Sequence, residues 1–162
     1  MENAGLKKYH EPNGQSYPIG ATIIDGGVNF SLFSKYGTAV TLAFFDHVDD
    51  VLPIRTIPLD PRVNKTYHYW HVFVSGIKKG QLYAYYINGP YDPASGHRFD
   101  VTKPLLDPYG KAVAVPRNYN RKVYKKKGVI PQIAGLKNVV ADNRQYDWED
   151  DFHPRRPFSQ TV

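Results

Sequence analysis

The chain has no cysteine among its 162 residues, and it also lacks any long apolar run. The first absence excludes disulfide bonds, zinc–thiolate sites, iron–sulfur clusters and thiol nucleophiles, and it suits a reducing compartment. The longest apolar stretch, residues 39–45, is seven residues long, whereas a membrane-spanning helix needs about 18. The first twenty residues contain no signal-peptide core. We therefore expect a soluble, cytoplasmic protein without a membrane partner.

The chain is also too short for the commonest catalytic barrel, because a (β/α)₈ barrel needs about 200–250 residues. Catalytic motifs of other folds are missing as well. No phosphate loop exists, since Gly26-Gly27 is not followed by Lys-Ser or Lys-Thr, and there is no Gly-x-Ser-x-Gly sequence. No spacing selects a carboxylate pair for glycoside hydrolysis. We expect no catalytic residue and no cofactor.

Two groups of residues resemble metal ligands only superficially. His68 and His71 lie three positions apart, and side chains at that spacing on a strand point to opposite faces. The acidic stretch 46–50 lacks the glycine and terminal glutamate of a calcium-binding EF-hand loop. We therefore expect no metal site.

The positive charge is concentrated in one segment. The chain has 21 Lys and Arg against 15 Asp and Glu, and six of the basic residues lie in residues 117–127. Tyr119 and Tyr124 are interleaved with them, as in single-strand nucleic-acid sites that combine phosphate attraction with base stacking. A solvated loop explains the run equally, and no RNA-recognition motif is present. Nucleic acid or an acidic partner remains the less favoured alternative.

Strand-like alternation of apolar residues dominates the first 90 residues. Period-two sets occur in residues 28–32, 40–44 and 70–74. The sequence Asp25-Gly26-Gly27 is typical of a hairpin turn, and prolines flanking residues 54–59 predict an edge strand. We expect the strands at 70–74 and 82–88 to form a hairpin.

These patterns, with a last strand in residues 137–142 and no helical stripe between strands, predict an all-β fold, an antiparallel β-sandwich. We divide the chain into an extended lead-in (1–19), the sandwich (20–142) and a linker-like tail (143–162). The irregular segment 89–109 is longer than most loops of compact domains, and its apolar residues predict that it packs on something.

Aromatic residues are the candidate ligand contacts. Aromatic side chains on a sheet face or a loop can stack on flat apolar surfaces, including sugar rings, and on this ground Trp70, Tyr85 and Tyr91 are candidates. Trp70 shares a strand face with Val72 and Val74, so a core position is the competing interpretation. Tyr91 lies on the irregular segment.

Several fragments, in order along the chain, match a known family. They are Pro18-Ile19-Gly20-Ala21-Thr22, Gly27-Val28-Asn29-Phe30-Ser31-Leu32-Phe33-Ser34, Gly89-Pro90-Tyr91-Asp92-Pro93, Gly96-His97-Arg98-Phe99, Leu105-Leu106-Asp107-Pro108-Tyr109, Trp148, Arg155-Arg156-Pro157 and Thr161-Val162. The chain resembles the amino-terminal domain of isoamylase and bacterial glycogen-debranching enzymes, carbohydrate-binding module family 48. The resemblance implies an immunoglobulin-like sandwich of the early-set type ahead of a glycoside hydrolase family 13 barrel, whose catalytic Asp and Glu match no position here.

The resemblance also implies sites. The chain would be a non-catalytic accessory domain of an enzyme acting on branched α-glucan, or alternatively an autonomous glycogen-binding or starch-binding module. Trp70 and Tyr91 lie near aromatic positions of glycogen-binding relatives, whereas Ala84 stands where those relatives carry a lysine, and residues 117–135 match nothing in the family. The expected contacts with a catalytic barrel are Tyr91, His97, Arg98, Phe99, Asp107, Tyr109, Trp148 and Phe158.

Overall fold

The computed structural model describes residues 13–142, 147, 149–151, 157 and 159. Almost all regular structure in this part is β. The elements, in chain order, are β1 (Gly20–Ile24), β2 (Gly27–Phe33), β3 (Ala39–Phe45), β4 (Arg55–Pro58), β5 (Lys65–Thr66), β6 (Tyr69–Ser75), β7 (Leu82–Asn88), β8 (Tyr91–Asp92), β9 (His97–Arg98), β10 (Ala112–Ala114), α1 (Arg121–Tyr124) and β11 (Lys137–Val139).

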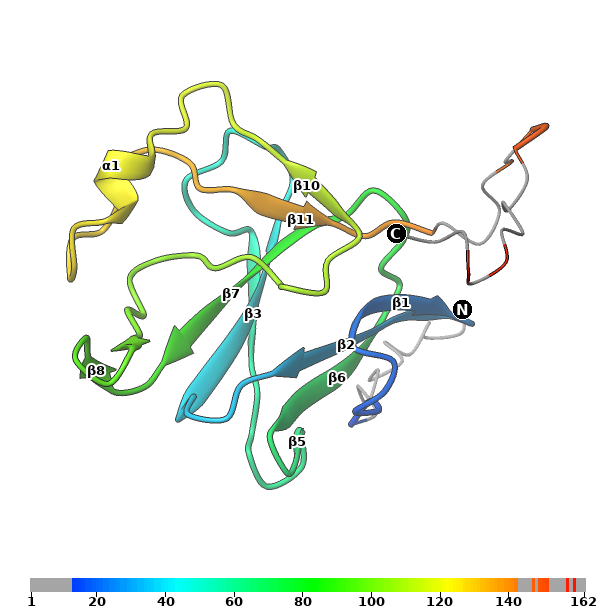
Figure 1. Ribbon diagram of the computed structural model, residues 1–162, viewed down its shortest axis with the longest axis horizontal. Helices are drawn as coiled ribbons and strands as arrows, with labels where there is room; N and C mark the ends of the chain where they lie inside the picture. Colours follow the sequence, from blue (N-terminus) through cyan, green and yellow to red (C-terminus); the bar gives the residue numbers. More distant parts are fainter. Residues whose placement is uncertain (1–12, 143–146, 148, 152–156, 158, 160–162) are drawn as a thin grey trace, which may run out of the picture.

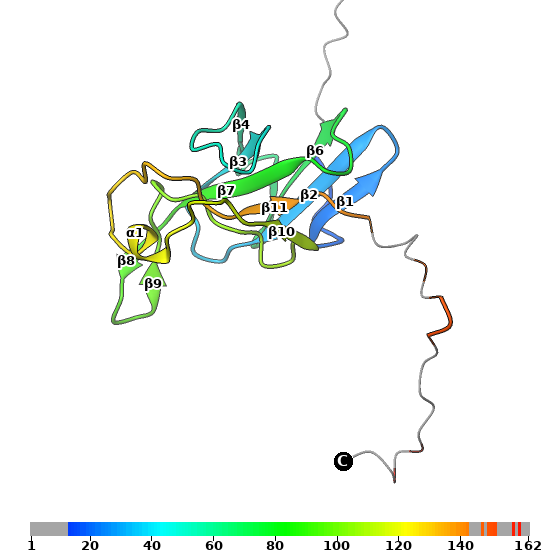
Figure 2. The ribbon, with the colours of Figure 1, turned by 90° about the horizontal axis from the view of Figure 1, so that it is seen from above.

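Two antiparallel sheets pack face to face. The four-stranded sheet has the order β1-β2-β6-β5 and the five-stranded sheet the order β10-β11-β7-β3-β4 (Figure 1). The short hairpin β8–β9 and the helix α1 lie together at one end of the sandwich in both ribbon views (Figure 2). This architecture confirms the predicted immunoglobulin-like sandwich.

The core forms where the alternating apolar residues of the two sheets meet. Phe30 on β2 lies directly opposite Val72 on β6 within one sheet. Its ring also contacts the other sheet edge-on, with centroids 5.6 Å from Phe44 and 5.1 Å from Tyr83. The predicted period-two sets are confirmed, since their apolar members are buried: Val28, Phe30, Leu32, Val40, Leu42, Phe44, Trp70, Val72 and Val74.

Two further predictions of local structure are confirmed. The turn Asp25-Gly26 joins β1 to β2, and Gly26 has a φ of 78°, a backbone region that favours glycine. Gly27 follows with no room for a side chain, because a Cβ there would lie 2.3 Å from the carbonyl oxygen of Val74. The strand predicted in residues 54–59 is β4, which forms an edge of its sheet.

The predicted hairpin between residues 70–74 and 82–88 is wrong. β6 pairs with β2 and β5, whereas β7 pairs with β3 and β11, so residues 76–81 carry the chain from one sheet to the other. Both strands bury the apolar residues of one face. This alternation occurs whether two strands are neighbours in one sheet or lie in different sheets on opposite sides of the core, so it could not predict their pairing. Within the described residues, no helix is long and apolar enough to cross a membrane.

Candidate functional site

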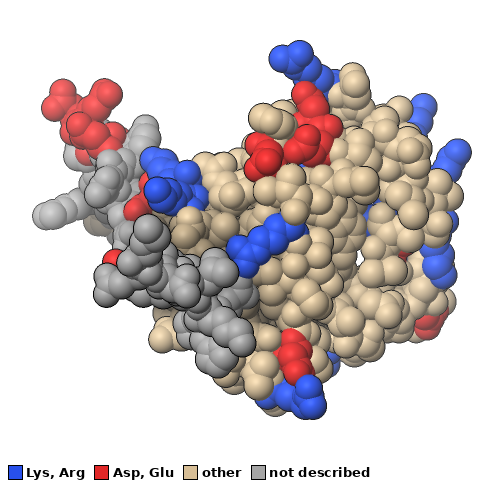
Figure 3. Space-filling view, turned by 180° about the vertical axis from the view of Figure 1, so that it is seen from behind, with Lys and Arg blue, Asp and Glu red and all other residues tan. Residues whose placement is uncertain are grey.

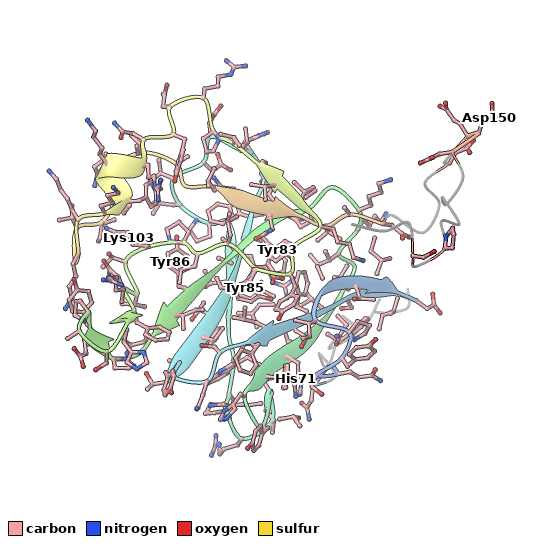
Figure 4. The ribbon with its side chains drawn as sticks, viewed as in Figure 1. His71, Tyr83, Tyr85, Tyr86, Lys103 and Asp150 are labelled. Carbon is pink, nitrogen blue, oxygen red and sulfur yellow. The ribbon has the colours of Figure 1, made fainter. Side chains whose placement is uncertain are left out.

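Two of the three predicted sugar contacts are core residues. Trp70 and Tyr85 are each 1% exposed, and Figure 4 shows Tyr85 pointing into the molecule from β7. The Lys65 ammonium lies 4.5 Å from the centroid of the Trp70 ring and caps it. Because both side chains are buried, neither can lie against a sugar, and both predictions are corrected to core positions.

Tyr91, the third candidate, is exposed and meets the basic segment. Its side chain on β8 is 44% exposed. The ammonium of Lys127 lies 3.4 Å from the centroid of its ring, within the range of a cation–π contact. The basic segment, residues 117–127, therefore folds back onto the irregular segment 89–109.

A groove of about 530 Å³ opens between these two segments. Its volume lies in the range of small-ligand sites. It combines aromatic rings, apolar side chains and charged groups, and its lining residues are Tyr91, Arg98, Asp100, Lys103, Pro104, Leu105, Leu106, Tyr119, Tyr124, Lys125, Lys127 and Leu136. We call it the Tyr91 groove.

One wall of the Tyr91 groove is held by α1 and the residues around it. The Asn120 side chain caps this short helix by accepting a hydrogen bond from the backbone N–H of Lys122 at 2.9 Å. The Tyr124 hydroxyl donates to the carbonyl oxygen of Ile133 at 2.8 Å, and the Tyr119 and Tyr124 rings lie 5.8 Å apart. These contacts fix two tyrosines in the wall.

Asp100 and Lys103 tie the opposite wall to the basic segment. Asp100 accepts hydrogen bonds from the Thr102 hydroxyl and from the backbone N–H of Gly128, at 2.6 and 2.9 Å. Burial acts to raise the pKa of Asp100, but these hydrogen bonds outweigh it and the pKa lies below its ordinary value. The Lys103 ammonium donates to the carbonyl oxygen of Val129. The Asp100 carboxylate therefore stabilises the position of the residues that follow the basic segment, through its hydrogen bond from Gly128.

The outer face of β7 near Ala84 is closed. Ala84 and the neighbouring Phe45 are at most 1% exposed. The Lys137 ammonium lies 4.6 Å from the Phe45 ring centroid and donates to the carbonyl oxygens of Val48 and Asp50, at 2.7 and 2.9 Å. Burial lowers the pKa of this lysine. Position 84, where the resemblance implies a lysine in glycogen-binding relatives, is therefore covered in this chain.

The expected barrel contacts divide into exposed and buried residues. Arg98 and Tyr109 are exposed, and His97 packs edge-on against Tyr36 with a centroid distance of 4.4 Å. Phe99 packs on the hydrophobic core, so only part of its ring is available. Trp148 and Phe158 lie outside the described residues.

Asp107 is a structural residue and not a surface contact. It is 3% exposed and accepts hydrogen bonds from the Tyr83 hydroxyl and the Tyr109 backbone N–H, each at 2.9 Å. Its backbone N–H donates to the Asn138 side chain at 2.6 Å. Burial raises its pKa. The predicted contact with a barrel is corrected, since Asp107 fastens the irregular segment to β7 through its carboxylate and to β11 through its backbone N–H.

The sequence did not identify the groove residues of the basic segment as members of a site with Tyr91. Tyr119, Tyr124, Lys125 and Lys127 were visible only as tyrosines interleaved with positive charge. The contact of Lys127 with Tyr91 on β8 depends on long-range folding. The described residues include no group of three or more His, Asp or Glu side chains that could hold a metal ion.

Comparison with known proteins gives a consistent set of relatives. The chain is 36% identical over 159 residues to the "Glycogen operon protein GlgX homolog" of Mycobacterium tuberculosis. It is also 36% identical over 152 residues both to "Isoamylase 1, chloroplastic" of Oryza sativa and to the "Glycogen debranching enzyme" of Serratia proteamaculans. Each match covers 92% of this chain but only 18–22% of the relative.

Solved structures share the fold. The Group B Streptococcus pullulanase SAP matches 81% of this chain with a TM-score of 0.53 and 25% identity, over 15% of its own chain. The pneumococcal glycogen-degrading virulence factor SpuA matches 83% with a TM-score of 0.54 and 18% identity, over 13% of its own chain. At 18% identity, the similarity to SpuA shows a shared fold and nothing more.

A family model covers more than half of the sequence. The model of carbohydrate-binding module 48, the isoamylase N-terminal domain, matches residues 18–110. That range contains both sheets apart from β10 and β11, and it includes Tyr91 and the β8–β9 hairpin. The chain belongs to the carbohydrate-binding module 48 family.

Proposed function

We propose that this chain is the non-catalytic accessory domain of a debranching-type glycoside hydrolase, and that it contacts branched α-glucan through the Tyr91 groove. The relatives are named as glycogen-debranching enzyme and isoamylase, and the chain spans about a fifth of their length. Cleavage of α-1,6 branches would then belong to the rest of such a longer protein, acting in the cytoplasm.

The observation that carries the glucan contact is the composition of the Tyr91 groove. Three tyrosines line it, and aromatic rings supply the flat apolar surface on which a sugar ring stacks. Arg98, Lys125 and Lys127 add hydrogen-bond donors that can reach sugar hydroxyls.

A second surface suits packing on a catalytic barrel. Exposed aromatic side chains flank the turn that follows β2: Phe33 is 44% and Tyr36 48% exposed, and His97 lies against Tyr36. Tyr67, 82% exposed, lies beyond them on the turn between β5 and β6. Exposed aromatic groups of this size often mark interaction sites. This cluster, with Tyr109, is our proposed barrel contact.

Affinity electrophoresis of the chain in gels containing glycogen tests the glucan contact. We expect the wild-type chain to be retarded relative to a glucan-free gel. The Tyr91→Ala variant should lose about fivefold in affinity, the effect of removing one stacking contact of about 1 kcal/mol. Tyr67→Ala is the matched control, because it removes an exposed tyrosine from the turn between β5 and β6, outside the Tyr91 groove, and should leave retardation unchanged.

Two results would contradict this proposal. Unretarded migration of the wild-type chain would show that the domain has no useful affinity for glucan. Equal retardation of wild type and Tyr91→Ala, with reduced retardation of Tyr67→Ala, would move the contact to the turn between β5 and β6.

A further inference from the structure

We propose that the Tyr91 groove recognises phosphate-bearing α-glucan, with a phosphate monoester held by Arg98, Lys125 and Lys127. This inference rests on the proposed function and makes it more specific, because it names the chemical class of glucan. It follows from the charge inside the groove, from the contact of Lys127 with the Tyr91 ring, and from the contact of Arg117 with Asp49 outside the groove.

The charge in the groove is strongly unbalanced. Four lining residues are basic and one is acidic. The acidic residue, Asp100, lies 3.9 Å from the Lys103 ammonium, so these two charges offset each other. Arg98, Lys125 and Lys127 have no carboxylate within 4.0 Å in the part of the chain that the structure describes. A site with three cations that have no carboxylate partner favours an anionic ligand over a neutral one.

The Lys127 ammonium also makes a neutral sugar the poorer ligand. At 3.4 Å from the ring centroid it occupies one face of Tyr91. A neutral sugar that stacks on that face must displace the Lys127 ammonium. Such a sugar offers the displaced ammonium no anionic group to pair with. A phosphate on the same sugar would accept the displaced ammonium as an ion pair, so the stacking and the charge contact reinforce each other.

A phosphate monoester fits three separated cations better than a carboxylate does. At neutral pH it carries close to two negative charges and three acceptor oxygens. Arg98 is on β9, whereas Lys125 and Lys127 follow α1, so the donors approach from two walls of the groove. A planar carboxylate carries only one negative charge, so it would leave at least one of these three cations without an anionic partner.

A nucleic-acid strand is the alternative ligand, and the structure disfavours it. Single-strand binding sites track a backbone of repeated phosphates. Here the basic segment does not form such a track, because Arg117 points to Asp49: its backbone N–H donates to that carboxylate at 2.9 Å and its guanidinium lies 4.0 Å away. On the face seen from behind, most of the described surface is uncharged, and the basic and acidic groups on it are small, some of them side by side (Figure 3).

Calorimetric titration with two maltooligosaccharides of equal length, one carrying a single glucose 6-phosphate, tests the inference. We expect the phosphorylated ligand to bind about tenfold more tightly at low salt, as one additional charged hydrogen bond would give. Added salt should reduce this preference. In Lys125→Gln/Lys127→Gln the preference should fall to less than about twofold. The control Lys78→Gln/Lys79→Gln, on the exposed turn after β6, should keep it.

The possible failures can be distinguished. Equal affinity for the two oligosaccharides would overturn the inference and leave the proposed function standing, whereas no binding of either would overturn the proposed function itself. A preference that survives Lys125→Gln/Lys127→Gln would place the phosphate elsewhere. Two competitors complete the test: displacement by equimolar inorganic phosphate would show a simple anion site, and tighter binding of a single-stranded oligonucleotide would assign the groove to nucleic acid.

Discussion

The Lys127 ammonium covers the ring of Tyr91 at 3.4 Å from its centroid. The contact joins the β8–β9 hairpin, which lies inside the range matched by the family model, to a basic segment outside that range. The Tyr91 groove exists only because these two segments meet. Its lining therefore combines residues inside the range of the family model with residues outside that range.

Tyr124→Phe should loosen the wall formed by the basic segment. The substitution removes the hydrogen bond from the Tyr124 hydroxyl to the Ile133 carbonyl, at 2.8 Å, and keeps the ring. We expect a loss of about 1 kcal/mol in the local stability of residues 119–136. Amide hydrogen exchange measures it: exchange in that segment should accelerate about fivefold while β2 and β6 stay protected. Unchanged exchange in the segment would contradict the account.

Lys137→Met should destabilise the whole domain. Burial of the Lys137 side chain is offset by hydrogen bonds to the carbonyl oxygens of Val48, Asp50 and Gly135. Methionine keeps most of the side-chain volume but leaves these acceptors unpaired, which should lower the free energy of unfolding by about 2 kcal/mol. Urea denaturation measures this. Lys78→Met, an exposed control, should change stability by less than about 0.5 kcal/mol.

Asp107→Asn should change how stability depends on pH. Burial raises the folded-state pKa of Asp107 above its ordinary 3.8, although hydrogen bonds from Tyr109 and Tyr83 act in the opposite direction. A raised folded-state pKa gives a stabilising contribution that is fully present below pH 3.8 and is lost as the pH rises through the folded-state value. The stability of the wild-type protein should therefore fall as the pH rises through that value, because the buried carboxyl group must then ionise.

Asparagine removes that ionisation and can still accept from the Tyr109 N–H while donating to the Tyr83 hydroxyl oxygen. The free energy of unfolding of Asp107→Asn, relative to wild type, should therefore rise from pH 4 to pH 7. Denaturation curves at several pH values check this, with Asp25→Asn on the exposed β1–β2 turn as control. Parallel stability profiles for Asp107→Asn and wild type would show that the carboxylate does not titrate in this range.

The alternation of apolar residues predicted much of the sandwich. Val28, Phe30 and Leu32 had to share one face of a strand, and the structure buries all three. The same pattern does not say which strand lies beside which, and for that reason the partner predicted for β6 was wrong. Alternation also treats a ring in the core and a ring beneath a ligand alike, which explains the misplacement of Trp70.

The candidate site was less predictable than the fold. Tyr91 could be selected because it is an aromatic residue on a loop. The family resemblance also places it near an aromatic position of glycogen-binding relatives. Lys127, however, meets Tyr91 only after the basic segment folds across the end of the sandwich, through the cap at Asn120 and the Asp100 hydrogen bond to Gly128. Such long-range contacts leave no local pattern in the sequence.

The most direct test of the account is a titration of the isotope-labelled chain with maltoheptaose, followed by the amide resonances of the chain. The glucan contact at the Tyr91 groove predicts saturable shifts centred on Tyr91, Arg98 and residues 119–127. It also predicts little change at Tyr67. Saturation confined to the turn between β5 and β6, or no shift at any amide of the groove, would contradict the account.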